Sequence, residues 1–266
     1  MTAHSSVDRA LPGLDARGPR CLLLGGSTAT GLGVRGHSFG RRSADQLGAS
    51  QVLDLTASGP LLDEALQRVQ EMVDFAPDVV IIGCGIAESI VHPPRRVQDF
   101  IERFAPSGWH GVAGLQPRPY FSTSSWRRRT RQRVTSWAKV RVKTATMKFG
   151  ARQRMDPAEF RQHFDLLLTS LRPLGACVVV VGAWETDDRL FPGTNDAFRA
   201  LDVTLAESIA AQGALLIDPR LCLRIWDDYL EDHMHWNDAG HERVAAQVVS
   251  AVRTAGPSSR RTAGGE

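Results

Sequence analysis

Short, continuous apolar runs alternate along the chain with longer segments in which apolar residues recur every three or four positions. The short runs are rich in Val, Ile and Leu, which is typical of strands buried on both faces of a parallel sheet. They predict five strands, at Cys21–Gly25, Gln51–Thr56, Asp78–Gly83, Cys177–Gly182 and Ala214–Asp218.

The segments between these runs predict helices that cover both faces of the sheet. Because right-handed crossovers join parallel strands, we expect an α/β fold, a three-layer α/β/α sandwich with a flavodoxin-like parallel five-stranded sheet. The simplest strand order is 2-1-3-4-5. The helices are expected at about Ser38–Leu47, Leu61–Phe75, Pro94–Phe104, Asp156–Leu171, Thr194–Ala211 and Asp238–Thr254.

The 266 residues are enough for one sizeable α/β domain. We expect a flexible segment over residues 1–19, the domain over 20–255 and a disordered, Gly/Ser/Arg-rich tail over 256–266. No apolar run approaches the roughly 18–20 residues of a membrane span, and the first 20 residues hold no apolar stretch typical of a secretory signal. We therefore expect a cytoplasmic protein.

The cysteines agree with a reducing compartment, because they lie in or beside apolar runs and form no CxxC pair. We expect packed, reduced thiols rather than disulfides or zinc ligands at Cys21, Cys84, Cys177 and Cys222.

The net charge of +3 comes from one segment. Between Phe104 and Asp156 there are 12 Lys and Arg residues and no acid, whereas the rest of the chain has 20 basic and 29 acidic residues. We place a basic insert at about residues 108–155, with helix-like stretches over Ser125–Gly150. One side of this helix carries Trp126, Thr130, Val134 and Trp137.

This insert has several interpretations. It is a solvated basic helix whose tryptophans pack on the domain, or a lid whose arginines meet an anionic substrate such as a phosphate, CoA or an acidic carrier protein. A basic amphipathic segment also suits peripheral contact with an anionic membrane surface. We expect no specific nucleic-acid partner, because no recognised binding motif accompanies the charge.

Three side chains of an acyl-transfer site lie near the two ends of the chain. Ser27 follows the first apolar run, and Asp232 and His235 stand three positions apart just before the last helix. A serine hydroxyl needs a base as it attacks, and a carboxylate holds the imidazole in one tautomer. A spacing of three places Asp232 and His235 on one face of a turn, which leaves one ring nitrogen for Ser27.

With these residues in place, the chain resembles the SGNH (GDSL-type) hydrolase superfamily from Cys21 to Val249. The first block reads GGS and ends at Ser27. The second reads DLTASGP, in which Gly59 matches the glycine of the oxyanion hole, and the last reads DHMHWNDAGH with Asp232 and His235. In GTNDAF, Asn195 resembles an asparagine common in the family.

The chain departs from the family at two places. Gly26 replaces the aspartate of the first block, which removes no chemical role. In GCGIAES, Ala87 stands where the family has an asparagine that donates its side-chain amide to the oxyanion. Alanine has no such donor, and losing one costs about 10²–10³ in rate. His92 and Arg95, in the HPPRR segment that follows, are candidate substrate-binding residues that could supply a donor.

The resemblance implies an esterase or lipase-like hydrolase that cleaves an acyl ester through an acyl-Ser27 intermediate, with the amides of Ser27 and Gly59 in the oxyanion hole. It implies no cofactor and no metal. The expected partner is a small-molecule acyl ester or acyl thioester, with an anionic one matching the basic insert. The alternatives are an acyltransferase using a thioester donor, and a catalytically weak ligand-binding member of the fold because of Ala87.

Other readings of the same segments predict different chemistry. Asp232, His235 and their neighbours His233 and His241 suggest a metal site, but no second ligand cluster accompanies them. GLGVRG at residues 31–36 matches the GxGxxG pattern of dinucleotide-binding turns. Four residues, STAT, separate it from the strand, and the candidate ribose carboxylate, Asp54, is expected inside the second strand.

Overall fold

The computed structural model describes residues 18–58, 61–111 and 114–255. Its centre is a parallel sheet of five strands in the order β2-β1-β3-β4-β5, as predicted. The strands are β1 (Arg20–Gly25), β2 (Gln51–Asp54), β3 (Val79–Gly83), β4 (Cys177–Val181) and β5 (Leu215–Ile217). The expected flexible segment (residues 1–19, apart from its last two residues) and the expected tail (256–266) lie outside the described residues.

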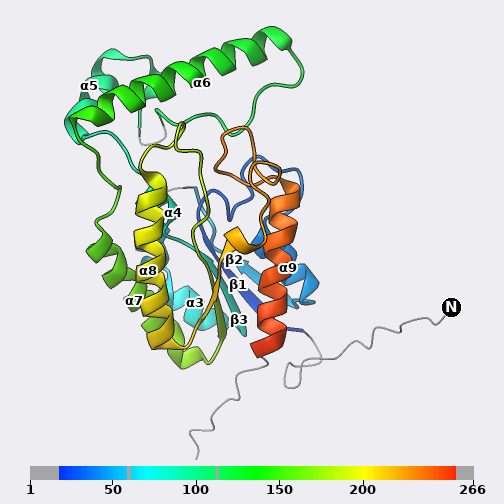
Figure 1. Cartoon of the computed structure of the whole chain (residues 1–266). Helices are drawn as coiled ribbons and strands as arrows, with labels where there is room; N and C mark the ends of the chain where they lie inside the picture. The colour runs from blue at the N-terminus through cyan, green and yellow to red at the C-terminus, as the bar shows by residue number, and fades with distance from the viewer. Residues whose placement is uncertain (1–17, 59–60, 112–113, 256–266) are drawn as a thin grey trace, which may run out of the picture.

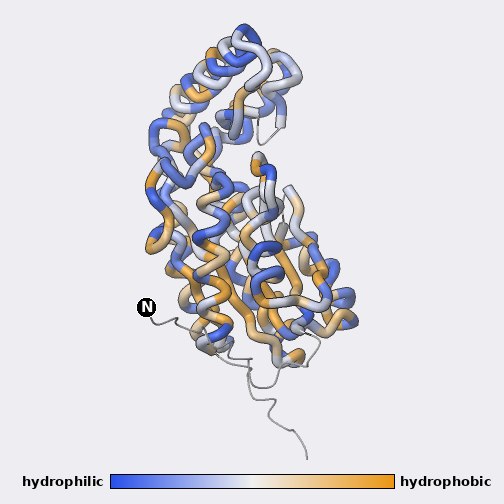
Figure 2. Tube along the Cα trace, turned by 90° about the vertical axis from the view of Figure 1, so that its right-hand side faces the viewer, coloured by the Kyte–Doolittle hydropathy of each residue, from blue (hydrophilic) through white to orange (hydrophobic). Residues whose placement is uncertain are grey.

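The strands form because their apolar runs lose contact with water on both faces. In β1, residues Cys21 to Leu24 are at most 2% exposed, and β3 is buried along nearly its whole length. Burying such a side chain contributes about 1.5–3 kcal/mol. The edge strands β2 and β5 are partly exposed, and β2 ends at Asp54, two residues earlier than predicted. Figure 2 shows the hydrophobic stretches gathered in this sheet.

Helices cover both faces of the sheet (Figure 1). Helices α1 (Phe39–Gln46) and α9 (Asp238–Ala255) pack together on one face. The other face carries α2 (Leu61–Gln67), α3 (Val69–Phe75), α7 (Pro157–Leu171) and α8 (Thr194–Gln212), with the short α4 (Ile86–Ser89) against α8.

The single helix predicted over Leu61–Phe75 is wrong, because the chain breaks at Arg68. Arg68 has φ −105° and ψ 13°, outside the helical range, and its amide donates to the carbonyl of Ala65. No Gly or Pro marks this position, so the pattern of apolar residues runs through it without a signal.

The basic insert lies at the end of the molecule where the strands have their carboxyl ends (Figure 1). It follows α5 (Arg95–Phe104) and contains the long helix α6 (Trp126–Thr146), which starts where the Ser125 hydroxyl accepts from the amide of Arg128. The expectation that its tryptophans pack on the domain is wrong. Trp126 and Trp137 are 74% and 61% exposed, because the buried face of α6 carries Ser136, Val140 and Lys143 instead.

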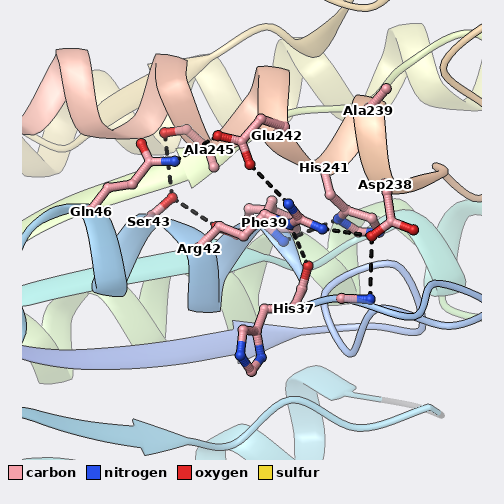
Figure 3. A network of polar contacts seen from close by, with 12 residues as sticks. His37, Phe39, Arg42, Ser43, Gln46, Asp238, Ala239, His241, Glu242 and Ala245 are labelled. Atoms are coloured by element: carbon pink, nitrogen blue, oxygen red, sulfur yellow. Dashed lines mark hydrogen bonds and ion pairs between the residues drawn. The ribbon is translucent and has the colours of Figure 1, made fainter.

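A polar network fixes α9 against α1 (Figure 3). Helix α9 begins directly after the segment that carries His235. The Arg42 guanidinium pairs with Asp238 and Glu242 at 2.6 and 2.9 Å. The amide of Phe39 donates to Nδ1 of the fully buried His241 at 3.0 Å. These contacts join residues about 200 positions apart, so the two ends of the domain are held together beside the candidate site.

This network predicts a pH-dependent stability. Burial and the nearby Arg42 lower the pKa of His241 from 6.5 to about 4, against a smaller opposite effect of Asp238. Below pH 6.5 the unfolded chain binds a proton that the folded imidazole does not, so the free energy of unfolding falls as the pH drops towards about 4. The shift corresponds to about 3 kcal/mol at the lower end of that window.

Urea unfolding of wild type and His241→Asn between about pH 4 and pH 7 checks this expectation. The asparagine oxygen can still accept from the Phe39 amide, so the fold is retained. The variant should lose less stability on acidification, with a remaining slope from His92, whose pKa is also lowered, to about 3. Equal slopes for the two proteins would contradict the assignment.

The four cysteines are free, as expected. Cys21 and Cys84 are buried, and burial raises the pKa of the Cys21 thiol to about 12. A thiol held in its neutral form is a poor nucleophile. No helix in the described part of the chain is both long enough and apolar enough to cross a membrane.

Candidate active site

The end of β1 forms a tight turn that presents Ser27. Gly25 has φ +152°, and a Cβ there would lie 2.5 Å from the Cβ of Ala29, so no larger residue fits this close approach. The amide of Gly26 donates to the carbonyl of Gly83 at 3.3 Å, which ties the turn to β3. The turn is therefore held by the backbone, although Gly26 replaces the aspartate of the family that the sequence resembles.

Asp232 and His235 lie in the loop before α9, which is closed on itself. The amide of Leu230 donates to the carbonyl of His235 at 2.7 Å. The Asp232 carboxylate is 1% exposed, and its Oδ1 accepts from the amides of Met234 and His235, both at 3.1 Å. Its Oδ2 lies 2.6 Å from Nδ1 of His235. The spacing of three thus brings the carboxylate to one ring nitrogen, as predicted.

The other ring nitrogen faces the serine. Oγ of Ser27 lies 2.8 Å from Nε2 of His235, across 208 positions of sequence. With the Nδ1 proton on the Asp232 side, Nε2 is the acceptor and the hydroxyl of Ser27 donates to it. The three groups therefore form a continuous hydrogen-bonded chain from hydroxyl to imidazole to buried carboxylate.

The two other imidazoles near His235 in sequence, those of His233 and His241, have partners elsewhere. His233 has φ +52°, stacks on Trp226 with ring centroids 4.5 Å apart, and places Nδ1 3.1 Å from Asp187. His241 is buried in α9 and accepts from the Phe39 amide. Neither imidazole shares a hydrogen bond with Ser27.

The His235 loop is fixed by an aromatic side chain that the sequence reading did not single out. Trp184 follows β4 and donates from its indole Nε1 to the carbonyl of Met234 at 2.7 Å. Asn195, in α8, accepts from the amide of Thr186 and donates to its carbonyl, which holds the segment after Trp184 in place. An indole N–H in an apolar run needs a buried acceptor, but the sequence does not say which.

Ser27 and His235 open onto a cavity of about 430 Å³. Its size suits a small organic ligand. One part of the lining is apolar, from Ile86, Ile90, Trp184 and Met234, and another carries polar side chains, Ser58, His92, Gln116 and Arg154. Gln116 and Arg154 come from the two ends of the basic insert, so the insert contributes to the walls of the cavity.

The structure describes some of the residues expected at the oxyanion hole but not all of them. Gly59 lies outside the described residues. Ala87 lines the cavity, so a methyl group stands in its wall at the position where the family that the sequence resembles has an asparagine. The backbone amide of Ser27 makes no hydrogen bond within the described part of the chain, which leaves it available as a donor.

Only one of the two candidate substrate-binding residues lines the cavity. His92 lines the cavity and is 3% exposed. Arg95 does not line it; this residue begins α5 on the exposed surface. Of the HPPRR segment, His92 is the residue that lines the cavity, so the expectation for Arg95 is wrong.

The metal and dinucleotide interpretations find no support in the geometry. Among residues 18–58, 61–111 and 114–255, no group of His, Cys, Asp and Glu could hold a metal ion. The glycines of residues 31–36 lie in a turn, and α1 starts only at Phe39. The expectation for Asp54 is wrong, since it is the last residue of β2, but its carboxylate is bound to the amide and hydroxyl of Thr56.

No protein-family model and no curated protein matches the sequence. Solved structures do match in fold. The acetyl-xylooligosaccharide esterase Axe2 from Geobacillus has a TM-score of 0.54 at 13% identity, over 88% of this chain and 93% of its own. The lipase/acylhydrolase from Enterococcus faecalis has a TM-score of 0.53 at 14% identity, over 91% and 98%.

A GDSL-like lipase from Bacteroides thetaiotaomicron has a TM-score of 0.52 at 11% identity, over 89% of this chain and 88% of its own. In Axe2, the catalytic mutants replace a serine, an aspartate and a histidine, the last two three positions apart. Identities this low establish fold rather than activity. The chain has the α/β/α fold of the SGNH (GDSL-type) hydrolases.

Proposed function

We propose that the protein is a serine hydrolase that cleaves an acyl ester through an acyl-Ser27 intermediate. The observation that carries the proposal is the chain Ser27 Oγ–His235 Nε2 at 2.8 Å and His235 Nδ1–Asp232 Oδ2 at 2.6 Å, at the wall of a cavity. The same spacing of aspartate and histidine in Axe2, with a catalytic serine, supports these roles.

The first half of the reaction forms the acyl-enzyme. Ser27 Oγ attacks the carbonyl carbon of the ester while Nε2 of His235 takes the hydroxyl proton, and Asp232 stabilises the resulting imidazolium. The carbonyl oxygen becomes an oxyanion that accepts from the amide of Ser27 and, in our proposal, of Gly59. The C–O bond to the alcohol then breaks, and the alcohol leaves with the proton from Nε2.

The second half releases the acid. Water donates a proton to Nε2 of His235 as its oxygen attacks the acyl carbon, and the new oxyanion occupies the same donors. When the bond to Oγ breaks, Ser27 regains the proton from Nε2 and the carboxylic acid departs. His235 therefore acts as base and acid in each half, and this chain needs no further group for proton transfer.

Rapid mixing with short-chain p-nitrophenyl esters tests the proposal. When formation of an acyl-enzyme is faster than its hydrolysis, a burst of p-nitrophenol equal to the enzyme concentration precedes steady turnover. We expect this burst in wild type and its loss in Ser27→Ala. Steady Ser27-dependent turnover without an acyl adduct on quenched enzyme would contradict the intermediate.

Product analysis with the same enzyme preparation distinguishes a hydrolase from an acyltransferase and from a ligand-binding protein. With acyl-CoAs and a panel of alcohols, an acyltransferase forms new ester faster than free acid, whereas a hydrolase yields the acid. A ligand-binding protein would form no adduct with any ester or thioester. We place hydrolysis first because water needs no acceptor site.

Position 87 provides a quantitative prediction. The family's asparagine is absent, so Ala87→Asn should add an amide donor to the cavity wall and raise kcat by about tenfold, less than the 10²–10³ typical of a fully organised donor. Ala87→Leu, of similar volume without a donor, is the matched control and should lower kcat. Steady-state kinetics on one ester checks both. If Ala87→Asn is as slow as Ala87→Leu, another group already fills the oxyanion hole.

A further inference from the structure

A group of cations that form no ion pair with any described residue surrounds His92 at one wall of the cavity. The backbone of His92 pairs with Arg152 in an antiparallel bridge, with N···O distances of 2.8 and 2.9 Å. This bridge joins the segment before α5 to the end of the insert. It also brings Arg154 into the lining of the cavity. The cluster is defined by His92, Lys143, Arg152 and Arg154.

Two members of the cluster are buried with polar atoms unused. Nε2 of His92 and Nζ of Lys143 have no hydrogen-bond partner within the described part of the chain. Lys143 is 1% exposed, and its ammonium lies 4.8 Å from the centre of the Phe191 ring. Burial lowers the pKa of Lys143 to about 8, so it is still mostly charged at neutral pH. A buried charge without an ionic partner is strongly destabilising.

Among the described residues, no ion pair joins an acid to Lys143, Arg152 or Arg154. Arg154 forms no ion pair with a described residue, and the Arg152 guanidinium donates to the neutral Gln98 at 2.9 Å. The buried Glu88 lies beside the cluster: its backbone carbonyl accepts from the amides of Arg154 and Met155 at 3.0 and 3.2 Å, and its Oε1 accepts from the amide of Leu62 at 3.3 Å. The insert itself contains no acid between Phe104 and Asp156.

The pKa of the His92 imidazole is lowered by burial and also by these positive charges. Burial first, and then Lys143, Arg152 and Arg154, lower the pKa of its imidazole to about 3. The ring is therefore neutral at physiological pH and can donate from Nε2. A wall that combines a neutral donor with two or three cations, next to a nucleophile, matches the needs of an oxyanion ligand.

We propose that this wall is a subsite for an anionic group of the substrate, a carboxylate or phosphate, which Arg154 and His92 contact and the buried charge of Lys143 attracts. The anion belongs to the ester substrate, so the assignment of its biological role rests on the proposed function. Binding of the anion does not rest on the proposed function, because Arg154 and His92 line the cavity and can take up a free anion whether or not Ser27 reacts. A substrate with this group would be held by its charged end while its ester carbonyl reaches Ser27.

Thermal unfolding with free anions tests the subsite without any catalysis. The probes are glutarate and inorganic phosphate, each compared with sodium chloride at equal ionic strength. We expect one of them to raise the Tm of wild type and of Ser27→Ala alike. The glutarate and phosphate arms show whether the site prefers a carboxylate or a phosphate. No rise with either anion would overturn the proposal.

Matched variants show whether the anion that raises the Tm binds at Arg154. Arg154→Gln should weaken the apparent Kd of the anion by about tenfold or more, as expected for loss of a charge-assisted hydrogen bond. Arg95→Gln removes an equal charge from the exposed start of α5 and should leave the Kd unchanged. An equal loss in both variants would mean that the anion binds only through the general surface charge.

Lys143→Met separates a binding role from a structural one. If Lys143 is kept for an anion, the apolar replacement should raise the Tm of the anion-free protein and remove the anion-dependent rise. If Lys143 serves only to pack on Phe191, the variant should have a lower Tm and an unchanged response to anions. The second result would overturn the role of Lys143.

Ester pairs that differ only in charge connect the subsite to turnover. One pair is p-nitrophenyl hemiglutarate and its methyl ester, with the charge on the acyl side. The other is 4-acetoxybenzoate and its methyl ester, with the charge on the alcohol side. We expect kcat/KM to favour the charged member of one pair by tenfold or more, and Arg154→Gln to remove the preference.

The outcomes distinguish the two proposals. If the neutral esters are cleaved with Ser27 dependence but neither pair shows a preference for charge, the subsite fails and the proposed function stands. If no ester is cleaved while the anions still stabilise the protein through Arg154, the proposed function fails and the anion site stands.

Discussion

Ser27→Ala should abolish ester turnover, with a loss in kcat on the order of 10⁴- to 10⁶-fold. The serine supplies the oxygen that forms the acyl bond, and its hydroxyl is the group hydrogen-bonded to Nε2 of His235. Alanine leaves the turn intact, because the contacts that hold it run through the backbone of Gly26 and Gly83. Steady-state hydrolysis of a p-nitrophenyl ester, with unfolding curves for both proteins, measures the effect.

Two controls sharpen this result. Ser58 also lines the cavity, but among the described residues no hydrogen bond joins it to His235, so Ser58→Ala should change kcat by less than about tenfold. The double variant Ser27→Ala, His235→Ala should be no slower than Ser27→Ala alone, because the two residues act as a unit. A Ser27→Ala protein that keeps more than a tenth of the wild-type rate would exclude Ser27 as nucleophile.

Asp232→Asn should lower kcat by about 10⁴-fold while the protein stays folded. The asparagine oxygen can still accept from the amides of Met234 and His235, so the loop retains its shape. Its NH₂ group, however, meets Nδ1 of the imidazole, which must then accept there and carry its proton on Nε2. In that tautomer His235 cannot take the proton of Ser27.

Asp228→Asn is the matched control, since Asp228 is fully buried and pairs with Arg224 and Arg243 rather than with His235. It should lower the Tm but change kcat by less than about tenfold. If both aspartate variants lose activity and stability in parallel, Asp232 has a structural role and does not set the tautomer of His235.

The sheet was predictable because its signal is local. Each strand is a short apolar run bounded by polar or turn residues. Right-handed crossovers between parallel strands allow few topologies, even with the long connection between β3 and β4 that holds the basic insert. The break at Arg68 was not predictable, since it interrupts an otherwise helical pattern without Gly or Pro. The predicted end of β2 was wrong for a similar reason. Thr56 is a residue that favours strands, but its amide donates to the Asp54 carboxylate and β2 ends at Asp54.

The candidate site was predictable in its chemistry and only partly in its surroundings. Ser27, Asp232 and His235 could be found because the roles demand those residue types and because the turn fixes a spacing of three. Gln116 and Arg154 could not be found, since their approach to Ser27 depends on how the insert folds back. The same dependence explains why the tryptophans of α6 face away from the domain.

Reaction with a fluorophosphonate tests the central claim most directly, because the probe replaces its fluoride with the attacking oxygen and records which residue is the nucleophile. Intact mass and peptide mapping should find one adduct per chain, on Ser27, in wild type. The adduct should be absent in Ser27→Ala and form much more slowly in Asp232→Asn. Labelling of Ser27→Ala at the wild-type rate, or no labelling of folded wild type by any probe chain length, would contradict the account.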